Sequence, residues 1–455
     1  MLTSYFTRFN YAYKDKLLAS FSYRDDRSSN FGSNKRSGFF PAGAVAYKLT
    51  DDDFIKDLNT FSNLKARVSY GVTGNDRIPA SLYLSTFGPY GVVLNETGNL
   101  QTGIEPKTLA NPNLKWESTR QFDVGLDMGF ANGRINASID YYSKKTTDLL
   151  IQIPIGQQWG FSNQYVNGGA IQNRGIELSV NTNNVRGKDL SWNSTVTFAY
   201  NKQKALDLGP GVTVISTNTA NPSGTVSGQE FTRVVPGIEL GELYGYVYEG
   251  VVKTGEKYAP QPNSKAGDPK YKDVNGDGKI TPDDRTYLGN SNPHYMAGFG
   301  NDFHYKGIDL GIFFQGAFDY YLYNMNAMVL ESTTGVAGLN RFVAGKNENT
   351  SIPREGYYLS TYGSYVNSRF VENASYVRLK SLTLAYNFPS SLFQHLKILQ
   401  GIRVYAEAQN LWTITGYKGT DPEVNVHSGA TGGGLDFNSF PAFRTITFGI
   451  KASIH

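Results

Sequence analysis

The stretch YKDVNGDGKITPDDR, residues 271–285, carries oxygen ligands at the spacing of a calcium-binding loop. In the EF-hand pattern, positions 1, 3, 5, 7, 9 and 12 supply ligands, and a glycine at position 6 allows the tight turn. Gly278 stands at position 6 and Ile280 at position 8. The predicted calcium ligands within 273–284 are Asp273, Asn275, Asp277, the carbonyl of Lys279, Thr281 (directly or through a water) and Asp284.

Two features distinguish this segment from a calcium sensor. Position 12 is Asp284 instead of glutamate, and its shorter side chain predicts a weaker site. No flanking helix is expected, because GDPKYK precedes the segment and Pro282 lies inside it. We therefore predict a structural calcium clip that orders a long loop with little core of its own. The alternative is a turn rich in Asx and glycine residues, whose carboxylates are solvated.

The remaining residues predict no enzyme. The chain has no cysteine, which excludes disulfides and thiolate chemistry, and its five histidines form no HxxxH or HxH pair. We find no GxSxG and no phosphate-binding loop. The adjacent Asp283 and Asp284 are more typical of turn and ligand residues than of a glycosidase pair.

Tryptophans could stack on sugars, although such residues more often pack or form membrane girdles. The best candidate is Trp159, because it falls in the loop sequence GQQWGFSNQY. The others are Trp116, Trp192 and Trp412.

The composition favours strands and turns. Of 455 residues, 18% are charged and 14% aromatic, with 49 glycines. A net charge of +4 without a basic run argues against a nucleic-acid partner. No apolar run reaches the roughly 18 residues of a membrane-spanning helix. The first residues lack the apolar core of a signal peptide and already alternate like a strand, so we expect the chain to be part of a longer protein.

Apolar and polar residues alternate with period two along most of the chain. In FDVGLDMGF (122–130) the apolar side chains share one face, and aspartates and glycines share the other. The segments LKARVSYGV, RINASIDY, IELSVN, IRVYAEAQ and TITFGIKASIH follow the same rule. The apolar positions change parity between Leu379 and Leu382, which predicts a β-bulge near Lys380 and Ser381 or an end of the buried zone.

The connections between predicted strands alternate in length. Short ones fall at 14–15, 131–133, 184–189 and 306–307, and two more, at 50–63 and 388–401, have room for a helical turn. Long ones run approximately over 74–118, 146–172, 203–293, 319–373 and 414–442. Short turns at one end and long loops at the other are typical of an outer-membrane barrel. About thirteen strands are predicted, beginning near residues 4, 16, 37, 64, 119, 134, 173, 191, 294, 308, 374, 402 and 443.

The same strand pattern fits other classes of protein. A secreted, calcium-binding β-sandwich that binds or hydrolyses glycans would also alternate, with its apolar face turned inward. A passive porin or a barrel adhesin would share the strand pattern. Because a whole bacterial barrel has an even number of strands, the odd count leads us to expect that this chain enters part-way round a barrel.

Several stretches together resemble the SusC/RagA-type TonB-linked outer-membrane proteins, or TonB-dependent receptors. They are spread in order over nearly the whole chain. The stretches are NLKARVSYGVTGND (63–76), NPNLKWESTRQFDVGLD (111–127), GGAIQNRGIELSV (168–180), YKDVNGDGKITPDDRTYLGNSNPHYMAGFGNDFHYKGIDL (271–310), ASYVRLKSLTLAYNFP (374–389) and VYAEAQNLWTITGYKGTDPE (404–423).

The resemblance implies an all-β transmembrane barrel in a Gram-negative outer membrane. Residues 1–455 would supply about the last thirteen strands of a 22-strand barrel of the plugged type, without plug, TonB box or amino-terminal extension. Residues 203–293 would be a long extracellular loop that contains the calcium segment. The whole protein would import oligosaccharides or peptides, with energy from TonB acting on the plug and a SusD-like surface lipoprotein over the mouth. Outer-membrane lipid would surround the barrel.

Overall fold

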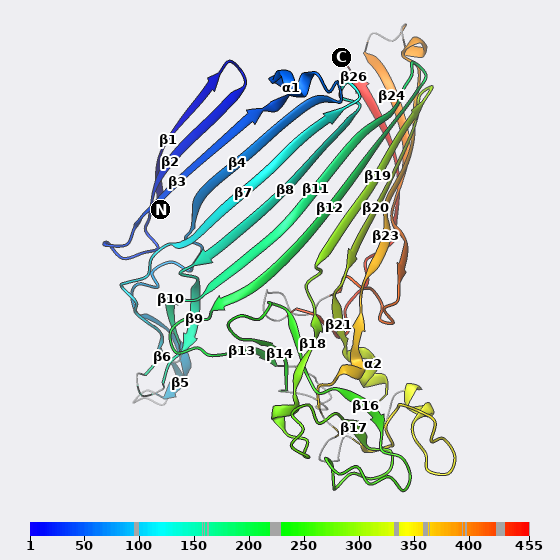
Figure 1. Ribbon diagram of the computed structural model, residues 1–455. Helices are drawn as coiled ribbons and strands as arrows, with labels where there is room; N and C mark the ends of the chain where they lie inside the picture. The colour runs from blue at the N-terminus through cyan, green and yellow to red at the C-terminus, as the bar shows by residue number, and fades with distance from the viewer. Residues whose placement is uncertain are drawn as a thin grey trace. The chain divides into compact units, whose positions relative to one another are not determined.

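A thirteen-stranded antiparallel sheet dominates the protein (Figure 1). The computed structural model describes all residues except 95–99, 157, 159, 162, 219–228, 332–335, 358–362, 364, 394, 396–397, 425–432 and 455. The strand order is β1-β2-β3-β4-β7-β8-β11-β12-β19-β20-β23-β24-β26, so β1 and β26 are the edge strands. The predicted number of long strands is thus confirmed. Because the sheet has two edges, it does not form a closed barrel.

The long strands begin close to the predicted residues. Their bounds are β1 Leu2–Tyr13, β2 Leu17–Ser28, β3 Ser37–Lys48, β4 Phe61–Asn75, β7 Glu117–Phe130, β8 Ile135–Thr147, β11 Ala170–Arg186, β12 Leu190–Asp207, β19 Tyr295–Tyr305, β20 Ile308–Phe318, β23 Tyr376–Asn387, β24 Leu399–Thr415 and β26 Thr445–Ile454. Two of the longer turns carry the predicted helical residues, α1 (Asp53–Lys56) and a 3-10 turn (Ser390–Phe393). None of the described helices is long and apolar enough to cross a membrane.

The chain divides into two compact units, which are described separately. Unit 1 comprises Met1–Val180, Lys202–Thr213 and Val235–Gly237. Unit 2 comprises Asn181–Asn201, Val214–Val234 and Ile238–His455.

The apolar rows of the long strands are exposed. Val68 and Tyr70 on β4 are 46% and 51% exposed, and Phe448 on β26 is 79% exposed. A β-sandwich buries such rows between two sheets, so this arrangement contradicts that alternative. An exposed apolar face on an antiparallel sheet is what a lipid environment requires.

The opposite face of unit 1 carries paired charges. Arg67 Nη2 lies 2.8 Å from Asp127 Oδ1 and 2.9 Å from Asp140 Oδ1, and Lys65 Nζ lies 2.8 Å from Asp127 Oδ2. Gly125 makes room for this cluster, because a Cβ there would lie 2.2 Å from Asp140 Oδ1. The two faces therefore differ as the period-two pattern predicted.

The predicted β-bulge is present on β23. Leu379 pairs with Phe314 and Ser381 with Phe313, so Lys380 has no partner of its own in the ladder with β20. The register with β24 shifts at the same place. The extra residue explains the change of parity between Leu379 and Leu382.

The long connections of unit 1 contain a small sheet of their own. Its order is β5-β6-β10-β9, with β5 at Thr86–Leu94, β6 at Leu100–Leu109, β10 at Asn163–Asn167 and β9 at Leu150–Pro154. Phe31, Leu82, Leu114 and Trp116 form a buried cluster beside it.

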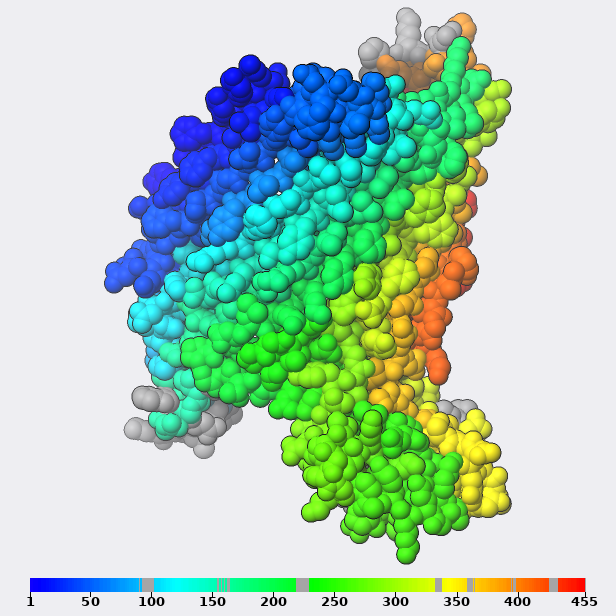
Figure 2. Space-filling view, in the orientation of Figure 1, coloured from blue at the N-terminus to red at the C-terminus, as the bar shows by residue number. Residues whose placement is uncertain are grey.

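The long connections of unit 2 fold into a cap, by which we mean residues 214–218, 229–234, 238–294, 319–375 and 416–444 where described. Its strands are β13 Ile215–Asn218, β14 Glu230–Val234, β15 Glu242–Gly245, β16 Tyr248–Val251, β17 Pro269–Tyr271, β18 Thr286–Asn290, β21 Tyr321–Asn324, β22 Val371–Asn373 and β25 Leu435–Asp436; its α-helix is α2, Met325–Leu330. Figure 2 shows the green and yellow residues of this cap as one compact mass.

The expectation that residues 203–293 form a loop with little core is wrong. One buried cluster unites Phe231 and Leu243 of this segment with Tyr323, Met325 and Leu435 from the other connections. A second contains Tyr246, Tyr271 and Ile280, which is position 8 of the predicted calcium loop. Side chains distant in sequence supply these cores, so period-two analysis of one segment could not reveal them.

Candidate functional site

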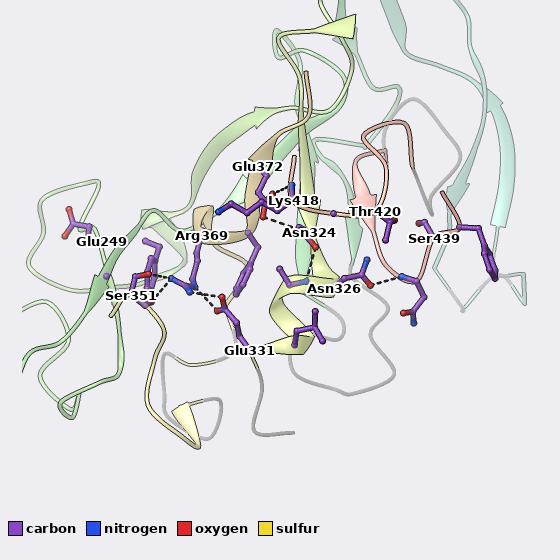
Figure 3. A pocket seen from close by; sticks show the side chains of 18 residues that line it. Glu249, Asn324, Asn326, Glu331, Ser351, Arg369, Glu372, Lys418, Thr420 and Ser439 are labelled. Carbon is purple, nitrogen blue, oxygen red and sulfur yellow. Dashed lines mark hydrogen bonds and ion pairs between the residues drawn. The ribbon is translucent and has the colours of Figure 1, made fainter. Parts of the chain in front are cut away.

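The cap encloses a pocket with a volume of about 1000 Å³ (Figure 3). Helix α2, strands β16 and β22, and the stretches 418–420 and 438–440 line it. This volume lies at the upper end of the range for ligand pockets, roughly 300–1000 Å³, and suits a ligand larger than one sugar or amino acid.

An ion pair forms one wall of the pocket. Arg369 Nε and Nη2 donate to the two carboxylate oxygens of Glu331, at 2.9 and 2.8 Å. Arg369 Nη1 donates to the carbonyl and hydroxyl oxygens of Ser351, at 2.6 and 2.8 Å. The guanidinium lies 5.4 Å from the ring centroid of Tyr248. Because both side chains of this bidentate pair are largely buried, Arg369 is held in one orientation.

Amide side chains connect α2 to the facing stretches. Asn324 Oδ1 accepts from Ala327 N at 2.9 Å and caps α2, while its Nδ2 donates to Glu372 at 3.3 Å. Glu372 also accepts from Lys418 N at 2.9 Å. Asn326 Oδ1 accepts from Asn438 N at 2.9 Å. These bonds fix both walls relative to the helix.

Some polar groups of the pocket remain available to a ligand. Within the described part of the chain, no hydrogen bond or ion pair involves the ammonium of Lys418 or the carboxylate of Glu249. Phe440 at the rim is 86% exposed. The lining thus offers charge, amide and aromatic contacts to a polar chain.

The pocket residues were not identified from the sequence. In the sequence alone, nothing distinguishes Arg369, Glu331 and Glu372 from other charged residues of the long connections. Their function depends on which loops meet, and no local motif signals that.

The predicted calcium loop lies in the cap, apart from the pocket lining. Asp273 accepts from Gly276 N and Gly278 N, both at 2.7 Å. Asn275 Oδ1 accepts from Asp277 N, and Asp277 Oδ1 from Lys279 N, each at 2.9 Å. Asn275 and Asp277 therefore form successive Asx turns, and Asp273 ties the start of the loop to its two glycines.

Asp284, at position 12, is fully buried. Its carboxylate accepts from Val274 N at 2.9 Å and Thr281 N at 2.7 Å, and Thr281 Oγ1 in turn accepts from Asp283 N at 3.3 Å. Asp284 and Thr281 thus form a capping box, in which Asp283 stays exposed.

The fit of this loop to a calcium ion is partial. In the described residues, no group of three or more acidic or histidine side chains is placed to hold a metal. The donor types still suit calcium, because carboxylate, amide and carbonyl oxygens are its ligands, and a carboxylate oxygen that accepts one hydrogen bond keeps a second lone pair.

The tryptophans have other partners. Trp116 is buried in the cluster of unit 1, and Trp192 donates to Asn301 Oδ1 at 2.9 Å. Trp412 is 54% exposed in the apolar row of β24. Trp159, the best sequence candidate for sugar stacking, lies outside the described residues.

His294 joins two cap segments just before β19. Its Nδ1 lies 2.8 Å from Asp319 Oδ2, and its Nε2 lies 2.8 Å from Glu239 Oε2. Burial lowers the pKa of His294, but the two carboxylates raise it by more, so the pKa lies above its ordinary value. A protonated ring donates to both carboxylates, whereas a neutral ring donates to only one.

We expect this contact to weaken as the pH rises. The stabilisation by His294 is complete below its unfolded pKa of about 6.5 and is lost as the pH rises through the higher folded pKa. Hydrogen exchange of amides 238–241, corrected for its intrinsic pH dependence, should therefore accelerate across this range. His294→Gln should abolish that acceleration, whereas His304→Gln should leave it intact. An unchanged profile in His294→Gln would contradict the assignment.

Comparisons with known proteins agree on one kind of protein. A protein-family model described as "TonB dependent receptor-like, beta-barrel" matches residues 2–411. TonB-dependent receptor P3 of Formosa agariphila is 36% identical over 99% of this chain and 45% of its own length. TonB-dependent receptor SusC of Bacteroides thetaiotaomicron is 31% identical over 99% of this chain and 43% of its own length.

A solved structure is also similar. The structure of the RagAB peptide transporter matches with a TM-score of 0.80 and 28% identity, over 99% of this chain and 47% of that one. The chain spans about half the length of the relatives it matches.

Proposed function

The chain belongs to the TonB-dependent receptor-like β-barrel family of the outer membrane, and from this premise we propose that it forms part of the wall and the cap of an importer of large nutrients. The cargo would be oligosaccharides or peptides. Energy would come from TonB, and a SusD-like surface lipoprotein would close the cap side.

The exposed apolar rows carry this proposal. In water, a row such as Val68 and Tyr70, each about half exposed, would be left unburied along a whole sheet. Beside lipid the same row is the stable arrangement, while the ion-paired face of Lys65, Arg67 and Asp127 turns to the lumen.

The pocket in the cap supports a role in cargo contact. Its ion pair and amides hold the walls, and Lys418, Glu249 and Phe440 remain open to a polar chain. One similar solved structure is that of a peptide transporter, which supports peptides as a cargo class, whereas the oligosaccharide class rests on the sequence resemblance. The relatives are receptors and transporters, which agrees with a binding role for the pocket.

We expect a bulky residue in the pocket to impair import. Thr420→Trp places an indole at the pocket wall without removing a hydrogen-bonded side chain. Uptake of labelled oligosaccharide and peptide mixtures should fall at least about tenfold for the transported class, as loss of a central contact costs roughly 1.4 kcal/mol or more. Lys257→Trp, on an exposed part of the cap, serves as the control. Uptake that continues after the proton gradient is dissipated would contradict TonB-dependent import.

We also propose that the loop 273–284 binds calcium as a structural ion. The support is the near-complete match of ligand types and spacing to the EF-hand pattern. Asp273, Asn275 and Asp277 would supply side-chain oxygens, Lys279 its carbonyl, and Asp284 would anchor the loop.

We expect chelation to loosen the cap. Without calcium, the carboxylates of the half-buried Asp273 and the exposed Asp277 repel one another, so cleavage by protease within 272–285 should accelerate. Limited proteolysis with EGTA, with added calcium and with added magnesium measures this effect. Equal cleavage under all three conditions would contradict calcium binding and would mean that hydrogen bonds alone hold the turn.

A further inference from the structure

The membrane-facing row of β19 contains one polar residue. Asn301 stands between Phe299 and Phe303, in a row whose members Phe299 and Tyr305 are 45% and 48% exposed. Asn301 itself is only 9% exposed. A buried amide within an apolar row needs hydrogen-bond partners, because hydrocarbon supplies none.

Neighbouring strands satisfy one side of this amide. Trp192 Nε1 donates to Asn301 Oδ1 at 2.9 Å, and Ser194 Oγ donates to the same oxygen at 2.7 Å. Asn184 Nδ2 donates to Ser194 Oγ at 2.6 Å. Since an indole N–H can only donate, the oxygen of Asn301 must face Trp192.

The other side of the amide is open. In the described part of the chain, Asn301 Nδ2 has no acceptor. Trp192 stacks on Phe303 with ring centroids 5.3 Å apart, which covers the cluster from one side. The cluster therefore presents a hydrogen-bond donor toward lipid, where only the oxygens of lipid head groups and glycerol esters can accept.

Basic side chains gather at the adjacent rim. Arg186 ends β11, and Lys188 lies in the following turn. Lys306 N donates to the carbonyl of Asp189 at 3.1 Å, which brings the turn after β19 beside this one. The Lys306 ammonium lies 5.4 Å from the ring centroid of Tyr305.

The charges at this rim are mostly uncompensated. No ion pair within the described residues involves Arg186, Lys188 or Lys306. The two turns, 187–189 and 306–307, contain one acidic side chain, that of Asp189. Long cationic side chains next to an aromatic girdle are placed to reach head-group phosphates.

The geometry points to a binding site for an anionic phospholipid on the outward face of β11, β12 and β19. Arg186 and Lys188 bind the phosphate group, and Asn301 Nδ2 donates to an ester oxygen. The acyl chains lie along the exposed row of Val196, Phe198 and Phe299. Charge complementarity favours a phospholipid over a second protein here, because three cations face one acidic side chain.

Quenching of Trp192 fluorescence by brominated lipid tests the site. The purified protein is placed in phosphatidylcholine vesicles that contain a minor fraction of phosphatidylglycerol, with bromine near the ester end of the chains of either lipid. The Trp192 signal is the difference between the native protein and Trp192→Phe. Brominated phosphatidylglycerol should quench it more than brominated phosphatidylcholine at equal fraction.

The variants separate this site from general charge attraction. Arg186→Gln and Lys188→Gln should each lower the preference for phosphatidylglycerol roughly fivefold. Asn301→Leu should weaken quenching by both lipids, because the ester oxygen that it would contact is common to both. Lys14→Gln, in the turn after β1, should have no effect. Equal quenching by both lipids, or a preference that survives Arg186→Gln with Lys188→Gln, would overturn the proposal.

Discussion

Replacing Arg378 by alanine is expected to reduce the free energy of unfolding by about 3–5 kcal/mol, because it leaves the buried carboxylate of Asp421 and the partly buried carboxylate of Glu423 without their cation. Arg378 is 2% exposed, the largest fully buried side chain in the described structure. Its Nη2 donates to Asp421 at 2.7 Å, its Nη1 donates to Glu423, and its Nε donates to Thr413 Oγ1 at 2.9 Å.

This cluster holds the connection between β24 and β26 in place. Asp421 also accepts from Ala442 N at 2.9 Å and from Glu423 N at 2.8 Å. Tyr376 donates to Glu423 at 2.6 Å, and Tyr320 donates to the carbonyl of Pro422 at 2.8 Å. Residues 418–420 and 438–440, which line the pocket, lie next to these fixed points, so Arg378 positions the pocket from outside it.

Urea unfolding in detergent, followed by fluorescence, measures the change in stability. Lys380→Gln is the matched control, because Lys380 lies 3.7 Å from Glu423 and is 38% exposed. It should cost less than about 1 kcal/mol. Arg378→Met should be milder than Arg378→Ala, since it fills the volume. Equal stability of the alanine and control variants would mean that the cluster is not coupled to unfolding.

Replacing Asp284 by alanine is expected to destabilise the cap by about 1–3 kcal/mol whether or not calcium is present, because three backbone N–H groups lose their acceptor. Asp284 accepts from Val274 N, Thr281 N and, at 3.4 Å, Asn275 N. Its position after Ile280 of the buried tyrosine cluster links the turn to the core of the cap.

Calcium binding and capping can be separated by a second variant. Asp277→Ala removes an exposed predicted ligand together with the acceptor of Lys279 N. Relative to the native protein, it should therefore loosen the turn more with calcium present than with chelator. Asp283→Ala, at an exposed position that is not a predicted ligand, is the control. Hydrogen exchange at 274–284, with calcium and with chelator, reads out all three variants. If Asp284→Ala matches the control, the capping role is wrong.

The turn also connects to the rest of the cap through Arg285. Its Nη1 donates to Glu230 at 2.9 Å, and its guanidinium lies 5.2 Å from the ring centroid of Tyr244. Loosening of 273–284 should thus reach β14 and β15. This path explains why a short turn can affect a larger part of the cap.

The long strands were predictable because each one records its environment locally. A strand with one face toward lipid and one toward a lumen alternates with period two, as Phe122, Val124 and Leu126 do against Asp123 and Gly125. Even the bulge at Lys380 left a trace, because one inserted residue reverses the parity of every position beyond it.

The cap was not predictable in the same way. Its cores combine Phe231, Leu243, Tyr323 and Leu435 from three connections, and no local period marks such residues. The pocket was missed for the same reason. Arg369 and Glu331 acquire a role only when the chain brings them within 2.9 Å.

The sequence by itself determined the strand number, the two-faced sheet and the calcium-like spacing, because neighbours within one strand or one turn set each of these. It also determined the family resemblance, through the order of several stretches along the chain. Only the tertiary structure decided three other features. Asp284 is buried within a capping box, the long connections of unit 2 share a core, and Arg378 holds a pocket wall. The shared core and the contacts of Arg378 depend on residues tens of positions apart, and Asp284 lies in a turn that packs through Ile280 on the buried tyrosines. In YKDVNGDGKITPDDR the sequence supplied the spacing of the acidic and amide side chains, whereas the fold decided that Asp284 is buried while Asp277 and Asp283 stay exposed.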